Sequence, residues 1–160
     1  MTKLKYILLF LFLGIVIAAC NRVADPCLQP RSVYMLLGTY RPADTGSNGV
    51  DSFLPKGIVR YIDNGVIADS GAKKNKFFIQ LSPQATVIKL LVSTDSTIAG
   101  TDTITFEYDR KLTFISTACG YTYHYTIKNV AWTNYNIDSV VVKNPEINGT
   151  ANIEHAKIFY

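Results

Sequence analysis

Residues 102–108 read DTITFEY, and polar and apolar side chains alternate from Thr103 to Tyr108. Successive side chains of a β-strand point to opposite faces, so Ile104, Phe106 and Tyr108 would share one face. Residues 121–128, YTYHYTIK, repeat the alternation with Tyr or Ile at every second position. The two stretches predict strands that bury one face and expose the other, as antiparallel sheets commonly do.

The rest of the chain carries β signals and no window with a convincing helical period. Ten Tyr, eight Phe and many Val, Ile and Thr favour strands. Asn64-Gly65 is a strong hairpin signal, and a tight turn is expected at Asp109-Arg110. We expect strands at residues 32–40, 58–62, 66–68, 76–80, 85–93, 102–108, 112–116, 121–128, 137–142 and 153–160.

Many short strands joined by polar turns predict an all-β fold, with one domain over residues 27–160. Our first choice is an antiparallel β-sandwich of the immunoglobulin-like type. A small β-barrel of the lipocalin type is the second choice.

The N-terminal segment has the layout of a secretory signal peptide. Lys3 and Lys5 precede an uncharged run from Tyr6 to Ala19, which is shorter than the roughly 20 apolar residues that cross a bilayer. Residues 17–20, Ile-Ala-Ala-Cys, resemble the lipobox of bacterial lipoproteins. This resemblance implies a signal peptide over residues 1–19, acylation of Cys20 and cleavage before it. A secreted protein with a chance cysteine, or an N-terminal membrane anchor, is the alternative.

The residues after Cys20 indicate where the lipid would hold the protein. Asn21 does not resemble an inner-membrane retention signal, and residues 22–26 lack the acidic cluster associated with surface export. We therefore expect a protein anchored in the bacterial outer membrane through the lipid on Cys20 and facing the periplasm. Residues 20–26 would form a short tether.

Two cysteines remain after Cys20, namely Cys27 and Cys119. An even pair in an oxidising compartment predicts one disulfide. It would close a loop of about 90 residues, which stabilises the fold by on the order of 4 kcal/mol in the chain-entropy model. The alternative is a free reactive thiol at Cys119.

The charge of the chain does not favour a nucleic-acid partner. The formal net charge is +4, but Lys3 and Lys5 would leave with the signal peptide. A weakly basic chain without a dense basic patch is no evidence for nucleic-acid binding. Membrane lipid and envelope proteins are the partners that we expect.

Several segments resemble an uncharacterised domain-of-unknown-function family of small Bacteroidota-type lipoproteins. The most specific element is Ser116-Thr117-Ala118-Cys119-Gly120-Tyr121. The resemblance covers most of the chain after the signal peptide and implies location and fold class, but no activity. The other segments that carry it are residues 102–108, 114–115, 137–140 and 155–160.

We find no motif for catalysis, a metal or a cofactor, and we expect a non-enzymatic protein. The two histidines, His124 and His155, are isolated in sequence, whereas a metal site needs several convergent ligands. No Gly-x-Ser-x-Gly elbow and no phosphate-binding Gly-rich loop occurs. The three glutamates form no pair with acid–base spacing.

Two weaker signals give further candidate sites. Exposed aromatic side chains could stack on sugar faces, whereas their period of two favours a sandwich core. The candidate ligand-binding residues are Tyr121, Tyr123, Tyr125 and Trp132. Asp95-Ser96-Thr97 resembles an Asp-Ser/Thr-apolar acceptor, which makes Ser96 a candidate for O-glycosylation. The expected role is thus an envelope structural or interaction protein, and a glycan- or ligand-binding β-module is the alternative.

Overall fold

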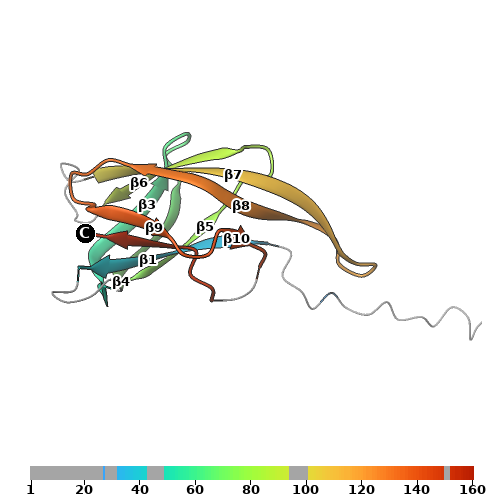
Figure 1. Ribbon diagram of the computed structural model, residues 1–160, viewed down its shortest axis with the longest axis horizontal. Coiled ribbons are helices and arrows are strands. Elements are labelled where there is room, and N and C mark those ends of the chain that lie inside the picture. Colours follow the sequence, from blue (N-terminus) through green and yellow to red (C-terminus); the bar gives the residue numbers. More distant parts are fainter. Residues whose placement is uncertain (1–26, 28–31, 43–48, 94–100, 150–151) are drawn as a thin grey trace, which may run out of the picture.

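The computed structural model describes residues 27, 32–42, 49–93, 101–149 and 152–160, which contain eleven strands and no helix (Figure 1). The all-β prediction is therefore confirmed. The strands are β1 (Tyr34–Arg41), β2 (Val50–Asp51), β3 (Leu54–Tyr61), β4 (Ile67–Lys74), β5 (Lys76–Gln80), β6 (Val87–Ser93), β7 (Thr101–Ser116), β8 (Gly120–Trp132), β9 (Ser139–Val142), β10 (Glu146–Ile147) and β11 (Ala156–Phe159).

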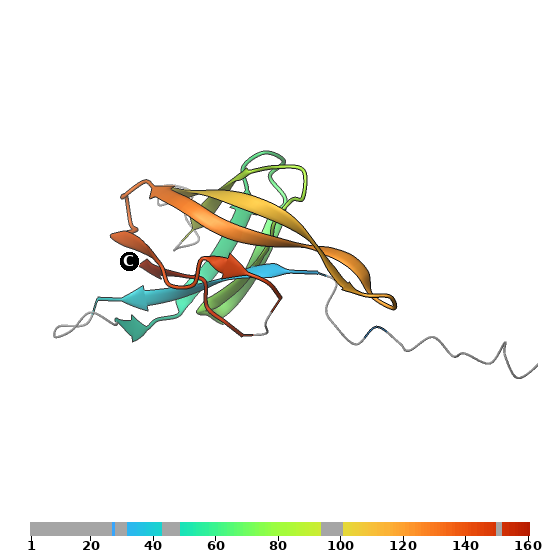
Figure 2. The ribbon, with the colours of Figure 1, turned by 45° about the vertical axis from the view of Figure 1, so that its right-hand side comes forward.

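The strands form two curled sheets, an arrangement consistent with a β-sandwich or a half-barrel (Figures 1 and 2). The first sheet has the order β2-β1-β11-β9, and β5 also pairs with β1. The second has the order β10-β8-β7-β6-β3-β4. All pairs are antiparallel except β1 and β11, which run parallel with Leu37 opposite Ala156. The predicted antiparallel sandwich did not include this parallel pair.

The hydrophobic core lies between the two sheets and follows the alternation of the strands. Ile104, Phe106 and Tyr108 of β7 are all buried, as the pattern of residues 102–108 predicts. The registers Met35 opposite Ile79 and Leu37 opposite Phe77 put four side chains of the first sheet on the inner face. Burial of each such side chain stabilises the fold by about 1.5–3 kcal/mol.

The two longest strands form a hairpin, β7–β8, whose far end extends beyond the other strands (Figures 1 and 2). The predicted turn at Asp109-Arg110 is wrong, because β7 continues through both residues to Ser116. Asp109 forms an ion pair with Lys128 at 3.0 Å, and Arg110 Nη1 donates to the carbonyl of Ala85 at 3.3 Å. Both residues pair with β8 just beyond a register shift between Glu107 and Tyr108, and their side chains find partners outside β7.

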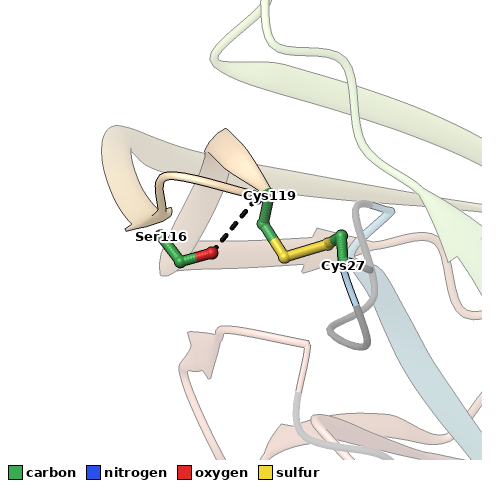
Figure 3. Close-up of a disulfide and its surroundings, with 3 residues drawn as sticks. All are labelled: Cys27, Ser116 and Cys119. Atoms are coloured by element: carbon green, nitrogen blue, oxygen red, sulfur yellow. Dashed lines mark hydrogen bonds between the residues drawn. A yellow bond between two sulfur atoms is a disulfide. The ribbon is translucent and has the colours of Figure 1, made fainter. Parts of the chain in front are cut away.

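The actual turn of the hairpin lies at residues 117–119, and it ends at Gly120, whose φ of 74° favours glycine. Here Cys119 forms a disulfide with Cys27 (Figure 3). The predicted turn at Asn64-Gly65 is confirmed in position: Gly65 has a φ of 67° and its N–H donates to the carbonyl of Tyr61 at 2.9 Å.

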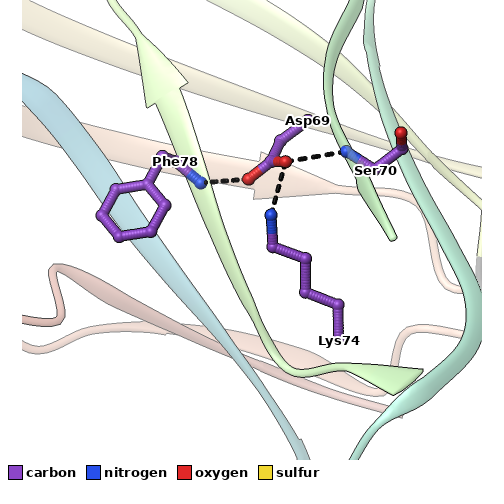
Figure 4. A network of polar contacts seen from close by, with 4 residues as sticks. All are labelled: Asp69, Ser70, Lys74 and Phe78. Carbon is purple, nitrogen blue, oxygen red and sulfur yellow. Dashed lines mark hydrogen bonds and ion pairs between the residues drawn. The ribbon is translucent and has the colours of Figure 1, made fainter. Parts of the chain in front are cut away.

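Asp69 links the two sheets where the chain passes from β4 to β5 (Figure 4). One carboxylate oxygen accepts from the backbone N–H of Phe78 at 2.8 Å. The other accepts from the N–H of Ser70 and forms an ion pair with Lys74. Because β4 belongs to the second sheet and β5 to the first, these contacts fix one corner of the fold.

Candidate functional site at the ribbon tip

The far end of the β7–β8 hairpin carries an apolar surface, which we call the ribbon-tip surface and define as Leu112, Phe114, Tyr121 and Tyr123. Leu112 lies opposite Tyr123, and Phe114 lies opposite Tyr121. The Phe114 and Tyr121 rings meet edge to face with centroids 5.2 Å apart. These four side chains therefore form one cross-strand cluster.

The ribbon-tip surface continues the buried face of the hairpin beyond the place where the first sheet covers it. Tyr108 opposite Ile127 marks the covered part of this face. Further along, Leu112 and Phe114 are each 54% exposed and Tyr121 is 65% exposed, whereas Tyr123 packs partly against the core. Clustered apolar exposure of this kind marks an interaction surface more often than scattered exposure does.

The disulfide anchors the N-terminal part of the chain to this tip. The Cα atoms of Cys27 and Cys119 are 4.8 Å apart, as the predicted pairing requires. The Ser116 hydroxyl accepts from the N–H of Cys119 at 3.1 Å and closes the turn (Figure 3). The disulfide therefore holds Cys27 at the ribbon tip.

The four aromatic residues singled out in the sequence do not form one platform. Tyr125 is buried, its hydroxyl donates to the carbonyl of Leu81 at 3.3 Å, and burial raises its pKa. Trp132, 37% exposed, lies at the other end of β8, roughly 36 Å along the strand from Tyr121. The structure brings Tyr121 and Tyr123 together with Leu112 and Phe114, which sequence reasoning missed because the register of β7 on β8 was unknown.

Two predicted sites lie outside the described residues, namely the lipidation site Cys20 and the O-glycosylation candidate Ser96. The predicted signal peptide, residues 1–19, and the predicted tether, residues 20–26, lie outside them as well. Within the part of the chain that the structure describes, no helix is long and apolar enough to cross a membrane.

An open depression of about 480 Å³ lies between the β3–β4 turn and the segment that follows β5. The Tyr61 hydroxyl donates to the carbonyl of Gln80 at 3.0 Å and accepts from its N–H at 3.1 Å. The Tyr108 hydroxyl donates to the carbonyl of Ser82 at 3.2 Å. Both tyrosine hydroxyls in the lining are thus hydrogen-bonded to the backbone. Among the described residues, the lining contains one carboxylate, that of Asp63.

Comparison with known proteins gives a family. A family model with the description "Family of unknown function (DUF6452)" matches residues 58–160. The chain belongs to the DUF6452 family. No curated protein and no solved structure matches it. The resemblance to a family of unknown function is thereby confirmed at that level.

The DUF6452 match includes the whole ribbon tip but begins after β1 and after Cys27. The structure nevertheless joins both to the matched part, since β1 lies between β5 and β11 and Cys27 bonds to Cys119. The folded unit of this DUF6452 protein therefore extends beyond the matched residues.

A second polar cluster of the DUF6452 protein, which sequence reasoning missed, depends on the parallel pairing of β1 with β11. The Tyr40 hydroxyl donates to Glu154 at 2.7 Å, and the Lys157 ammonium lies 4.0 Å from the centroid of the Tyr40 ring. Burial, followed by the contact with Glu154, raises the pKa of the Tyr40 phenol above its ordinary value. A phenol held in its protonated form is a hydrogen-bond donor, so the cluster fastens residue 154 to β1.

His155 is buried beside this cluster and forms hydrogen bonds with the backbone of β1. Its Nδ1 accepts from the backbone N–H of Leu36 at 2.9 Å, and the backbone N–H of His155 donates to the carbonyl of Leu36 at 2.9 Å. Burial lowers the pKa of the imidazole. Among the described residues of the DUF6452 protein, no group of three or more His, Cys, Asp or Glu could hold a metal ion.

Proposed function

We propose that this DUF6452 protein is a small Bacteroidota-type lipoprotein, anchored through Cys20 in the outer membrane and facing the periplasm, which acts by non-enzymatic contacts with envelope components. The observation that carries the proposal is the sequence Ile17-Ala18-Ala19-Cys20 at the end of an uncharged run. Small residues before the cysteine allow a peptidase to approach the backbone. Two or three acyl chains give stable anchoring, whereas one is marginal.

The disulfide supports the same proposal from the folded part of the chain. Disulfides persist in oxidising compartments such as the periplasm and are rare in the cytosol. Cys27 follows Cys20 by seven residues and is bonded to Cys119. A chain exported with its N-terminus acylated would therefore meet the conditions that this bond needs.

The side chains exposed on the domain favour a role in binding other envelope components. The ribbon-tip surface offers aliphatic and aromatic side chains, which are the usual centre of a binding surface. Around the depression, the Tyr61 and Tyr108 hydroxyls are hydrogen-bonded to the backbone. The apolar ribbon-tip surface and the hydrogen-bonded Tyr61 and Tyr108 hydroxyls therefore fit a binding role better than acid–base catalysis.

Intact mass measurement of the protein purified from a bacterial host tests the anchoring. We expect a chain that begins at Cys20 and carries the mass of two or three acyl groups, and that fractionates with the outer membrane. A Cys20→Ser variant should lose the added mass and the membrane association, whereas the matched Cys27→Ser variant should keep both. An unacylated chain cut at another residue would contradict the proposal.

Protease treatment of intact cells tests the orientation. We expect the protein to be cleaved only after the outer membrane has been opened. Digestion on intact cells would place the domain on the cell surface and refute a periplasm-facing role.

Glycan binding is the second candidate function, and the exposed ring of Tyr121 favours it because aromatic faces can stack on sugars. Binding to purified cell-wall glycan that is lost on Tyr121→Ala and retained on Trp132→Phe would support it. Equal binding by both variants would remove the role of the ribbon-tip surface in glycan recognition.

A further inference from the structure

We infer that the ribbon-tip surface rests on the lipid bilayer, with its rings at the level of the headgroups, and so fixes how the domain is oriented on the membrane. This inference rests on the proposed acylation of Cys20. It adds a second contact, made by side chains of the folded domain, to the contact made by the lipid.

The first argument is the length of the chain between the lipid and the tip. Seven residues lead from Cys20 to Cys27, and fully extended they span at most roughly 25 Å. Cys27 is bonded directly into the turn of the hairpin. The tip is therefore the part of the domain held next to the membrane, while Trp132 ends β8 at the opposite end of the strand and Tyr135 follows it.

The second argument is the chemistry of the tip. Residues 110–125 contain no Asp or Glu, and the exposed Arg110 precedes Leu112 and Phe114 on the same face of β7. Tyrosine rings are enriched at membrane interfaces because one end is apolar and the other polar. Basic side chains are attracted to anionic headgroups. Rings that share their face with a cation, in a stretch without carboxylates of its own, thus match the surface of a bilayer.

The third argument is the polarity of the surface itself. Its four side chains, which are Leu112, Phe114, Tyr121 and Tyr123, carry two phenol hydroxyls and no amide or carboxylate. A sugar site needs several hydrogen-bonding groups placed around the stacking ring, in addition to the ring. Lipid therefore fits this cluster better than a glycan does.

The test uses the mature, acylated protein in vesicles of phosphatidylethanolamine and phosphatidylglycerol, with or without brominated acyl chains that quench tryptophan. Trp132→Phe removes the one native tryptophan. In that background Tyr121→Trp reports on the tip, and Tyr135→Trp, at a position that is 80% exposed, is the matched reporter at the far end. Circular dichroism and thiol counting confirm that each variant is folded with its disulfide.

We expect brominated lipid to lower the Tyr121→Trp emission about twofold and to leave the Tyr135→Trp emission nearly unchanged, because interfacial side chains reach about 5–10 Å into the headgroup boundary. Adding Leu112→Ser and Phe114→Ser should abolish the quenching while the lipid tether remains. This combined variant separates contact by the surface from mere closeness of the tether.

Each result decides between the two proposals. If Cys20 carries lipid but Tyr121→Trp is not quenched, or both reporters are quenched equally, the bilayer contact is wrong and the anchoring stands. Quenching that persists in the Leu112→Ser and Phe114→Ser protein also overturns the contact. A chain without lipid on Cys20 overturns both.

Discussion

The buried carboxylate of Asp102 accepts a hydrogen bond at 3.0 Å from the backbone N–H of Ile137, 35 residues further along the chain. The same carboxylate accepts from the N–H groups of Tyr135 and Asn136 and from the Thr133 hydroxyl. One side chain of β7 thus shapes the whole loop between β8 and β9. Its four acceptor contacts explain how a charge is accommodated in the interior.

Asp102→Asn should therefore destabilise the protein strongly. The amide keeps one acceptor oxygen and turns an NH2 group toward backbone donors, so about two of the four contacts are lost. We expect the free energy of unfolding to fall by about 3 kcal/mol, or the melting temperature by about 10 °C. Asp138→Asn, at an exposed position beside the loop, is the control and should change neither; equal effects would refute the role of Asp102.

Acidification should destabilise the protein through His155. Burial lowers the pKa of this imidazole below 6.5 in the folded state, whereas the unfolded chain titrates near that value. As the pH falls through 6.5 toward the lowered pKa, the unfolded chain binds a proton that the folded chain does not bind, so the free energy of unfolding decreases. Urea denaturation at several pH values measures this loss.

The pH dependence can be assigned to His155 by substitution. His155→Gln should lower the stability at neutral pH and flatten the loss below pH 6.5. His124→Gln, at the partly exposed histidine of β8, should keep the wild-type slope. A slope unchanged by His155→Gln would show that other groups control the acid response.

Loss of the Cys27–Cys119 disulfide should cost more than any of these changes. The bond joins residues 92 positions apart, and the chain-entropy model gives about 4.5 kcal/mol for such a loop. We expect the Cys27→Ser/Cys119→Ser protein to melt well below the oxidised protein and at the same temperature with or without reductant. A reductant-dependent melting temperature in the double variant would contradict this interpretation.

The effect of substituting Gly120 on stability should depend only on how readily the new residue adopts a positive φ. A Cβ at this position meets no heavy atom within 4 Å, but its φ is +74°. Gly120→Asn should cost little because Asn adopts the left-handed region more readily than other residues. Gly120→Val should cost about 2 kcal/mol, measured by thermal unfolding. Equal stability of the two variants would show that the turn adopts another conformation.

Local patterns predicted the fold well because they depend on neighbouring residues. The alternation of residues 102–108 gave the inner face of β7, and the two cysteines gave the disulfide. The turn expected at Asp109-Arg110 is wrong because both residues pair with β8, Asp109 opposite Thr126 and Arg110 opposite Tyr125, and this pairing leaves no local signal.

The candidate site could be predicted only in part. Tyr121 and Tyr123 were singled out by their spacing, but Leu112 and Phe114 join them only through the cross-strand register. The contact between Tyr40 and Glu154 spans 114 positions, and the parallel pairing that creates it leaves no local signal. The pattern of side chains along the chain therefore does not predict which distant strands pair or in which register.

The parallel pair of β1 and β11 also has a consequence for biosynthesis. Residues that meet there, such as Leu36 and His155, are 119 positions apart, so the first sheet cannot close until the last strand has been made. Contacts of such high sequence separation slow folding. A chain that leaves the ribosome and threads through a translocon N-terminus first would keep β1 open throughout its passage. In a chain exported as proposed above, the topology would delay folding until after translocation and would leave an unpaired strand edge open to aggregation.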